Sequence, residues 1–132
     1  MENRFTLVIP GRALCQVVKP ANKPGYFQWL SVEPRYRRQG YCLELMKFAI
    51  NYSRESLEMD ILRSAKSCQR NAARLGYRKT GDSSNRFYRC ELWRYFGSPS
   101  KRYRSRLKLL KTIRYERCDG TTRVLYLSTS LH

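Results

Sequence analysis

The central feature of this sequence is Val32-Glu33-Pro34-Arg35-Tyr36-Arg37-Arg38-Gln39-Gly40-Tyr41-Cys42, a basic turn that contains a glycine. The preceding residues, 26–32, are rich in aromatic and branched side chains, and this composition predicts a strand. Pro34 ends that strand, because proline has no N–H to donate to a neighbouring strand. After Gly40, apolar residues recur at the spacing of one helix face: Cys42, Leu45, Met46, Ala49 and Ile50. This pattern predicts a helix of about three to four turns.

A strand that leads through such a turn into a helix forms an anion-binding site. The first N–H groups of a helix have no acceptor within it, and the helix dipole adds partial positive charge at the same end. Gly40 lets a ligand approach the backbone, and Arg37 and Arg38 add full positive charges. The turn therefore predicts a site for a phosphate or pyrophosphate group.

The turn resembles motif A of the GCN5-related N-acetyltransferases (GNAT), Gln/Arg-x-x-Gly-x-Gly/Ala, which binds the pyrophosphate of acetyl-coenzyme A (acetyl-CoA). The resemblance assigns this role to Arg37, Arg38, Gln39, Gly40, Tyr41 and Cys42. Cys42 departs from the motif, since glycine or alanine is usual there, but cysteine is also small. In this family the strand before the motif and its neighbour splay apart and hold the pantetheine arm. The resemblance therefore assigns the backbone of Leu30, Ser31 and Val32 to the cofactor.

A second resemblance to the same family follows in residues 64–81. Residues 64–75 predict a helix with Ala65, Cys68, Ala72 and Leu75 on one face. Leu75-Gly76-Tyr77 then resembles motif B, a helix that ends in Leu-Gly-Phe/Tyr before a strand, and glycine suits this position after the helix because it accepts a positive φ. The two motifs in this order imply the fold of the family. That fold is an α/β domain with a mixed, largely antiparallel sheet, flanking helices and a splayed strand pair that holds acetyl-CoA.

The other strands of this region are predicted from local composition. Residues 5–9 and 13–19 predict a hairpin around the Pro10-Gly11 turn. Residues 56–62 alternate apolar and polar side chains, which predicts a half-buried strand. Residues 87–93 follow a turn at 82–85 and predict a further strand.

The usual proton-transfer groups of the family do not carry over to this sequence. Ala72 occupies the position of the tyrosine that protonates the departing thiolate in many members, and Ala65 lies near the position of a usual asparagine. The glutamate that serves as base in the histone-acetylating branch corresponds to a position near Tyr26. No catalytic residue is therefore assigned. Ser64 and Cys68 are candidates near the thioester, and the alternative is that they cap the helix and fill the core.

Composition narrows the class of protein and partner. The 132 residues include 27 Lys and Arg against 10 Asp and Glu, a formal net charge of +17, which favours polyanionic partners such as RNA, DNA or an acidic protein face. No apolar run approaches the roughly 18–20 residues of a membrane span, and the N-terminus lacks a signal-peptide pattern. The five cysteines are scattered, without a Cys-x-x-Cys pair, and there is one histidine. These features predict a cytoplasmic protein with reduced thiols and no metal site.

The resemblance covers residues 4–93, which predicts a GNAT-like acetyl-CoA-binding core at 1–93 and a basic C-terminal appendage at 94–132. In the appendage, Tyr103, Leu107 and Leu110 share one face of a predicted helix at 101–113. Strand-like segments at 112–118 and 121–128 flank Asp119-Gly120, a strong hairpin signal. The family usually has two helices before these strands, and they build much of the acceptor wall. Here the appendage, or a second subunit in a homodimer, could complete that wall.

Together these features predict an N-acetyltransferase that moves an acetyl group from acetyl-CoA to an amine on a macromolecule, either a protein lysine or the α-amine of an aminoacyl-tRNA. The positive charge favours an acceptor that is acidic or bound to nucleic acid, so an acidic protein or RNA is the expected partner. The alternative is a protein that keeps the fold without the chemistry, and that binds nucleic acid or inhibits a protein partner through its basic surface. The missing tyrosine and glutamate favour this alternative, and the loop at 37–40 favours the enzyme.

Overall fold

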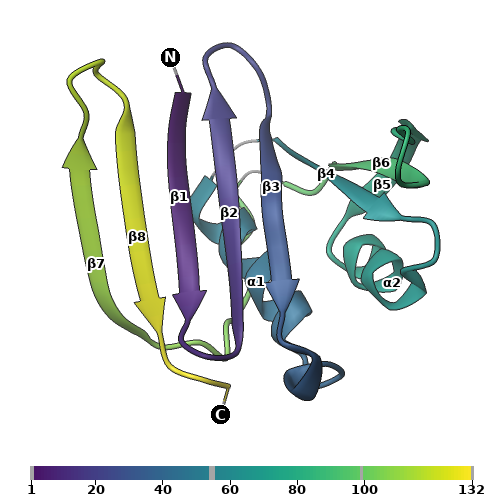
Figure 1. Ribbon diagram of the computed structural model, residues 1–132, viewed down its shortest axis with the longest axis horizontal. Coiled ribbons are helices and arrows are strands. Elements are labelled where there is room, and N and C mark those ends of the chain that lie inside the picture. The colour runs from purple at the N-terminus through teal and green to yellow at the C-terminus, as the bar shows by residue number, and fades with distance from the viewer. Residues whose placement is uncertain (1, 54–55, 99, 132) are drawn as a thin grey trace.

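The computed structural model describes residues 2–53, 56–98 and 100–131 (Figure 1). Within these ranges, eight strands form one sheet in the order β5-β6-β4-β3-β2-β1-β8-β7. The elements in chain order are β1 (Glu2–Ile9), β2 (Ala13–Pro20), β3 (Gly25–Val32), the 3₁₀ helix η1 (Pro34–Tyr36), α1 (Tyr41–Ser53), β4 (Leu57–Leu62), α2 (Lys66–Arg74), β5 (Tyr77–Asp82), β6 (Cys90–Tyr95), β7 (Leu109–Glu116) and β8 (Thr122–Ser128). The pairs β1–β8 and β3–β4 are parallel and the other pairs are antiparallel. The predicted fold class, a mixed and largely antiparallel α/β domain, is confirmed.

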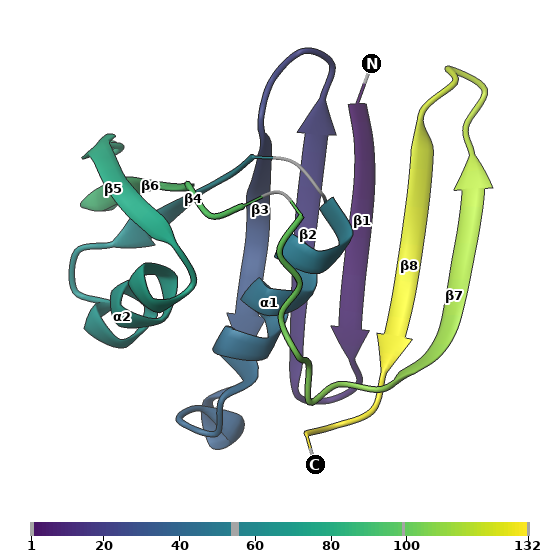
Figure 2. The ribbon, with the colours of Figure 1, turned by 180° about the vertical axis from the view of Figure 1, so that it is seen from behind.

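The helix α1 covers one face of the sheet (Figure 2). Apolar side chains alternate along the β1–β2 hairpin, so that Leu7, Ile9 and Cys15 are buried on the face toward the helix. Leu45 and Phe48 of α1 pack in the same cluster. The helix forms as predicted because its apolar residues recur on one face, and burial of that face against the sheet stabilises it.

The strands β3 and β4 are adjacent only at their beginnings. Their register contains two pairs, Gly25 with Leu57 and Tyr26 with Glu58. Beyond this point β4 continues beside β6, while β3 stays beside β2. The splayed strand pair expected for the fold is therefore present, and it leaves the end of β3 without a neighbouring strand on the side toward α2 (Figure 1).

The segment that resembles motif B has the predicted local structure. Gly76 follows α2 with φ +97°, and a Cβ there would lie 3.3 Å from the Gly97 backbone. Ala72, Leu75 and Tyr77 are buried in the core next to this turn. Glycine is required at position 76 because other residues adopt this φ only with strain.

The predicted helix at 101–113 is wrong. Residues 101–108 instead run over α1 without helical structure, and β7 begins at Leu109 (Figure 2). The Asn51 side chain of α1 bonds both backbone groups of Tyr103, accepting from its N–H at 2.8 Å and donating to its C=O at 2.8 Å. The Tyr103 hydroxyl also donates to the Leu75 carbonyl at 2.7 Å. These tertiary hydrogen bonds satisfy backbone groups that a helix would have paired internally, so the extended form is favoured.

The predicted C-terminal hairpin is confirmed, and it joins the same sheet. β7 and β8 pair around Gly120, which has φ +84°. β8 then pairs in parallel with β1, from Arg123 beside Arg4 to Leu127 beside Val8. The expected boundary between residues 93 and 94 falls inside β6, and the strands beyond it extend the sheet at the β1 edge.

The strand predicted at 87–93 begins later, at Cys90. The side-chain oxygen of Asn85 accepts hydrogen bonds from the N–H groups of Phe87 and Tyr88, which holds this segment in a turn.

Among the described residues, no helix is both long enough and apolar enough to cross a membrane.

Candidate functional site

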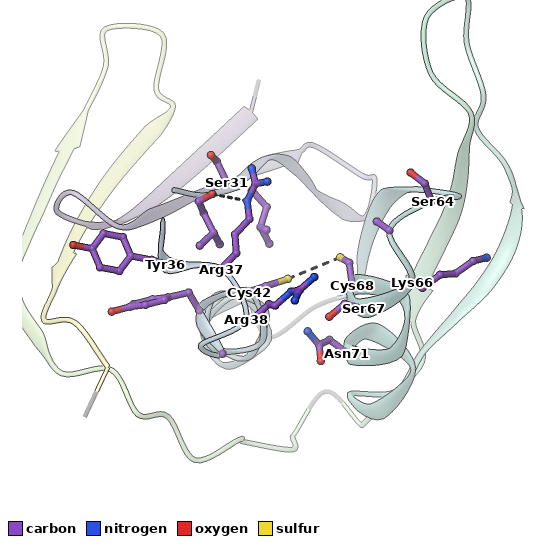
Figure 3. A pocket seen from close by; sticks show the side chains of 15 residues that line it. Ser31, Tyr36, Arg37, Arg38, Cys42, Ser64, Lys66, Ser67, Cys68 and Asn71 are labelled. Carbon is purple, nitrogen blue, oxygen red and sulfur yellow. Dashed lines mark hydrogen bonds between the residues drawn. The ribbon is translucent and has the colours of Figure 1, made fainter. Parts of the chain in front are cut away.

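A cavity of about 600 Å³ lies between the end of β3, the loop before α1, and α2 (Figure 3). Its lining residues come from two parts of the chain and are Leu30, Ser31, Val32, Tyr36, Arg37, Arg38, Gly40, Tyr41, Cys42, Ser64, Ala65, Lys66, Ser67, Cys68 and Asn71. The structure thus brings together the predicted strand residues and the predicted loop residues around one cavity. Gln39 is the exception, because its side chain is exposed and it is absent from the lining.

The loop before α1 is a tight, ordered turn. Arg37 donates from Nε to the Val32 carbonyl at 3.2 Å, which ties the loop back to β3. Arg38 has φ +65° and Gly40 has φ +98°, so the chain reverses direction immediately before the helix. The Glu44 N–H donates to the Gly40 carbonyl at 3.1 Å and begins the helical pattern. The N–H groups of residues 41–43 therefore have no acceptor within the helix.

Positive charge is concentrated at this end of α1. The Arg38 side chain extends across the cavity toward α2 (Figure 3). Lys66, the first residue of α2, lines the opposite wall. Because the N-termini of α1 and α2 both border the cavity, their helix dipoles add partial positive charge to these side chains. The arrangement suits a ligand with several negative charges.

Two cysteines meet inside the cavity. The Sγ atoms of Cys42 in α1 and Cys68 in α2 lie 3.9 Å apart (Figure 3). Hydrogen bonds from the Cys68 thiol and from Asn71 lower the pKa of Cys42, although burial opposes this effect. The hydrogen bond to Cys42, together with burial, raises the pKa of Cys68.

Several lining residues were not predicted from the sequence: Tyr36, Lys66, Ser67 and Asn71. The helix at 64–75 was expected, but the sequence alone did not show which of its sides faces the loop. Asn71 provides an amide at the cavity, whereas the asparagine position expected from the family holds Ala65. Ser64 and Cys68, the two candidates for proton transfer, both line the cavity.

The structure also shows the surroundings of the two positions at which the family's tyrosine and glutamate are missing. Ala72 is fully buried in the core. Tyr26 pairs with Glu58 where β3 and β4 meet, but the Glu58 carboxylate forms an ion pair with the Arg94 guanidinium. Tyr41 has a structural role, since its buried hydroxyl accepts from Arg12 at 3.4 Å and from the Leu131 N–H at 3.3 Å.

Comparison with known proteins identifies the family to which this fold and cavity belong. Residues 8–92 match the family model described as the acetyltransferase (GNAT) family. No curated protein matches the sequence. Among solved structures, the ribosomal-protein-S18-alanine N-acetyltransferase of Escherichia coli is similar with a TM-score of 0.58 and 15% identity, over 67% of this chain and 64% of that one.

Two further structures share the fold. A putative GNAT-family acetyltransferase from Bordetella pertussis has a TM-score of 0.52 and 19% identity, over 64% of this chain and 56% of that one. A spermidine N-acetyltransferase chimera that includes the Vibrio cholerae enzyme has a TM-score of 0.54 and 12% identity, over 64% of this chain and 58% of that one. The chain thus spans 56–64% of the length of these three structures.

Proposed function

The chain belongs to the acetyltransferase (GNAT) family, and from this premise we propose that it transfers an acetyl group from acetyl-CoA to an amine on a macromolecule. One observation carries the proposal: the basic loop at the start of α1 opens into the same cavity as the end of β3, which pairs with β2 on one edge and with no strand on the other. The family's cofactor has a charged pyrophosphate and a long polar arm. This cavity provides a matching wall for each part.

The residues present fit acetyl-CoA. The N–H groups of residues 41–43 and the side chain of Arg38 would hold the pyrophosphate. The backbone of residues 30–32 would hold the pantetheine arm, because beyond Tyr26 this edge of β3 has no strand to pair with. When bound, acetyl-CoA supplies the acetyl group as an activated thioester. The role of the chain is to hold that group and to orient the acceptor amine.

The expected proton-transfer residues are absent, so the chain must rely mainly on positioning. General acid–base catalysis contributes typically about 10²–10⁴ in rate, and its loss slows transfer without preventing it. Ser64 and Cys68 are the residues of the cavity that we propose as substitutes. As the C–N bond to the acceptor formed and the C–S bond of the thioester broke, one of these groups, or water, would take the proton that the amine nitrogen loses and pass it to the departing coenzyme A thiolate.

The acceptor is proposed from charge. With a formal net charge of +17, the protein attracts acidic surfaces and repels small polyamines. We therefore propose as acceptor a lysine on an acidic protein or the amine of an aminoacyl-tRNA.

The second candidate function is a binding protein without chemistry. It is favoured by Ala72, which is buried where many members of the family have the tyrosine that protonates the thiolate. Such a protein would bind nucleic acid or a protein partner through the basic surface.

Calorimetric titration with acetyl-CoA tests the cofactor site. In Arg38→Glu a cavity-lining cation becomes an anion, and we expect affinity to fall about tenfold or more, a loss of at least about 1.4 kcal/mol. The matched control is Arg35→Glu, which makes the same charge change in η1, outside the cavity lining, and should weaken binding far less. Equal losses in both variants, or no binding by the wild type, would overturn the proposed site.

Turnover separates the two candidate functions. Release of free coenzyme A is followed by chromatography after the addition of acidic protein or charged tRNA. Acceptor-dependent release of coenzyme A supports the enzyme. Binding of acetyl-CoA without such release supports the binding protein.

A further inference from the structure

The Cys42 and Cys68 thiols form a pair that the acetyl-transfer proposal does not require as a pair. Cys42 is the second residue of α1 and Cys68 is the third residue of α2, and their Sγ atoms are 3.9 Å apart. Both residues line the cavity and are half-buried. By contrast, Cys15 is fully buried, and its burial raises its pKa to about 12.

The two thiols differ in reactivity in a way that suits disulfide exchange. Cys42 lies in the first turn of α1, where unpaired N–H groups and the helix dipole stabilise a thiolate. The Asn71 side chain and the Cys68 thiol also favour the Cys42 thiolate. Cys68 stays protonated beside it. An attacking thiolate and a protonated neighbour, both accessible, are the arrangement used by redox-active cysteine pairs.

The geometry also allows a disulfide bond between them. A disulfide requires a sulfur separation of about 2.05 Å and Cβ atoms about 3.5–4.5 Å apart. The two Sγ atoms, 3.9 Å apart, would have to close to that length through rotation of the two side chains and an approach of the two helices. The bond would join the first turn of α1 to α2, which are the two walls of the cavity.

We propose that Cys42 and Cys68 form a redox site that a low-molecular-weight disulfide converts from dithiol to disulfide. The Cys42 thiolate attacks one sulfur of that disulfide, whose S–S bond breaks, and a mixed disulfide forms as one small thiolate leaves. Cys68 then loses its proton to solvent and attacks the Cys42 sulfur, and the second small thiolate leaves. Two electrons pass from the protein to the small disulfide, which ends as two thiols, while Cys42 and Cys68 become linked.

The link would lower the affinity of the cavity for its ligand. It draws the start of α1 toward α2, where Arg38, Ser67 and Asn71 face the cavity. It also fixes Cys42, the last residue of the segment that resembles motif A. This consequence rests on the proposed function, because acetyl-CoA is the ligand measured, whereas formation of the disulfide does not depend on it.

Peptide mapping by mass spectrometry tests the redox site. The full-length protein is incubated with glutathione disulfide as the probe, and we expect a Cys42–Cys68 link that dithiothreitol reverses. The Cys68→Ser variant should accumulate glutathione on Cys42, since it lacks the second thiol, while Cys42→Ser should accumulate little on Cys68. Cys118→Ser is the control, because it removes an exposed thiol outside the cavity, and it should link as the wild type does. Failure to link, or preferential modification of Cys68, would overturn the proposal.

Calorimetry then tests the consequence of oxidation. We expect oxidised wild type to bind acetyl-CoA about tenfold more weakly than reduced wild type, and dithiothreitol to restore the affinity. The Cys118→Ser variant, which lacks only an exposed thiol outside the cavity, should show the same difference between its two redox states. Equal affinity in the two redox states would overturn the effect on binding. Reduced protein that binds no acetyl-CoA would overturn the proposed function and this effect with it, and mapping alone would still decide whether the disulfide forms.

Discussion

The carboxylate of Glu44 accepts hydrogen bonds from the backbone N–H of Arg106 at 3.2 and 3.3 Å, although the two residues are 62 positions apart. Glu44 is almost completely buried, and Lys47 pairs with it at 3.3 Å. The contact joins α1, which follows the cavity loop, to the segment that leads into β7. The C-terminal region therefore holds α1, the helix whose N-terminus borders the cavity.

Replacing Glu44 tests this support. Glu44→Ala removes the carboxylate that accepts from the Arg106 N–H, and it leaves the Lys47 ammonium with only the Arg104 carbonyl at 3.4 Å. We expect it to lower the free energy of unfolding by about 2–3 kcal/mol. Glu44→Gln keeps one acceptor oxygen and should lose less. Urea denaturation measures both. The control, Glu116→Ala on the exposed face of β7, should change stability by less than about 0.5 kcal/mol, and an equal loss there would contradict the role of Glu44.

Truncation tests whether residues 94–132 are an appendage or part of the core. Side chains beyond residue 98 pack against the buried cluster under α1, namely Leu107, Leu109, Tyr126 and Leu131. A chain that ends at residue 98 would expose this cluster and the β1 edge, so we expect it to aggregate or to show no cooperative thermal transition. A soluble truncated chain with a sharp transition, followed by circular dichroism, would show that the core folds alone.

The backbone conformation of Gly40 leads to a prediction about the loop before α1. Its φ is +98°, and a Cβ there would lie 3.4 Å from the Arg106 guanidinium and 3.8 Å from the Leu131 side chain. We expect Gly40→Ala to cost roughly 1–2 kcal/mol of stability and to weaken acetyl-CoA binding about tenfold, because the loop must shift. Gly81→Ala is the matched control, since an added Cβ meets no atom within 4 Å there. Calorimetric titration of both variants with acetyl-CoA measures the change in affinity. Unaffected binding in Gly40→Ala would contradict the expectation that binding depends on the conformation of this loop.

The lowered pKa of Cys42 makes a prediction about pH. A lowered pKa means that the thiolate persists to lower pH, so alkylation of Cys42 by iodoacetamide should reach half its maximal rate below the ordinary thiol value of about 8.5. Cys68→Ala removes the main hydrogen bond that lowers this pKa, and the midpoint should rise. Rates are followed by mass spectrometry of the Cys42 peptide. A midpoint that is unchanged in Cys68→Ala would contradict the coupling between the two thiols.

Local signals account for the elements that were predicted correctly. Pro34 and Gly40 delimit the loop, and the apolar spacing of residues 42–50 specifies α1, because a buried helix face needs that period. Gly76 and Gly120 both adopt the positive φ that their turns require. Each of these features depends on a few neighbouring residues.

The prediction of a helix at 101–113 was wrong because an extended segment can show the same spacing of apolar residues. Tyr103 and Leu107 are held against α1 and the core in an extended chain. Leu110, the third member of the supposed helix face, is 65% exposed in β7. Apolar spacing over a short segment therefore did not distinguish a helix from an extended segment buried at two points.

Sequence alone thus determined the family resemblance, the glycine-bearing turn before α1 and the order of the elements through α2, since these depend on local conformational preferences and short motifs. Only the tertiary structure decided that β8 pairs with β1, that Asn51 and Glu44 hold the chain between β6 and β7, and that Cys42 meets Cys68. These contacts join residues that are 26 to 119 positions apart, from Cys42–Cys68 to Arg4–Arg123. Their energies come from burial and hydrogen bonds between segments that are distant in the sequence, so no local pattern specifies them.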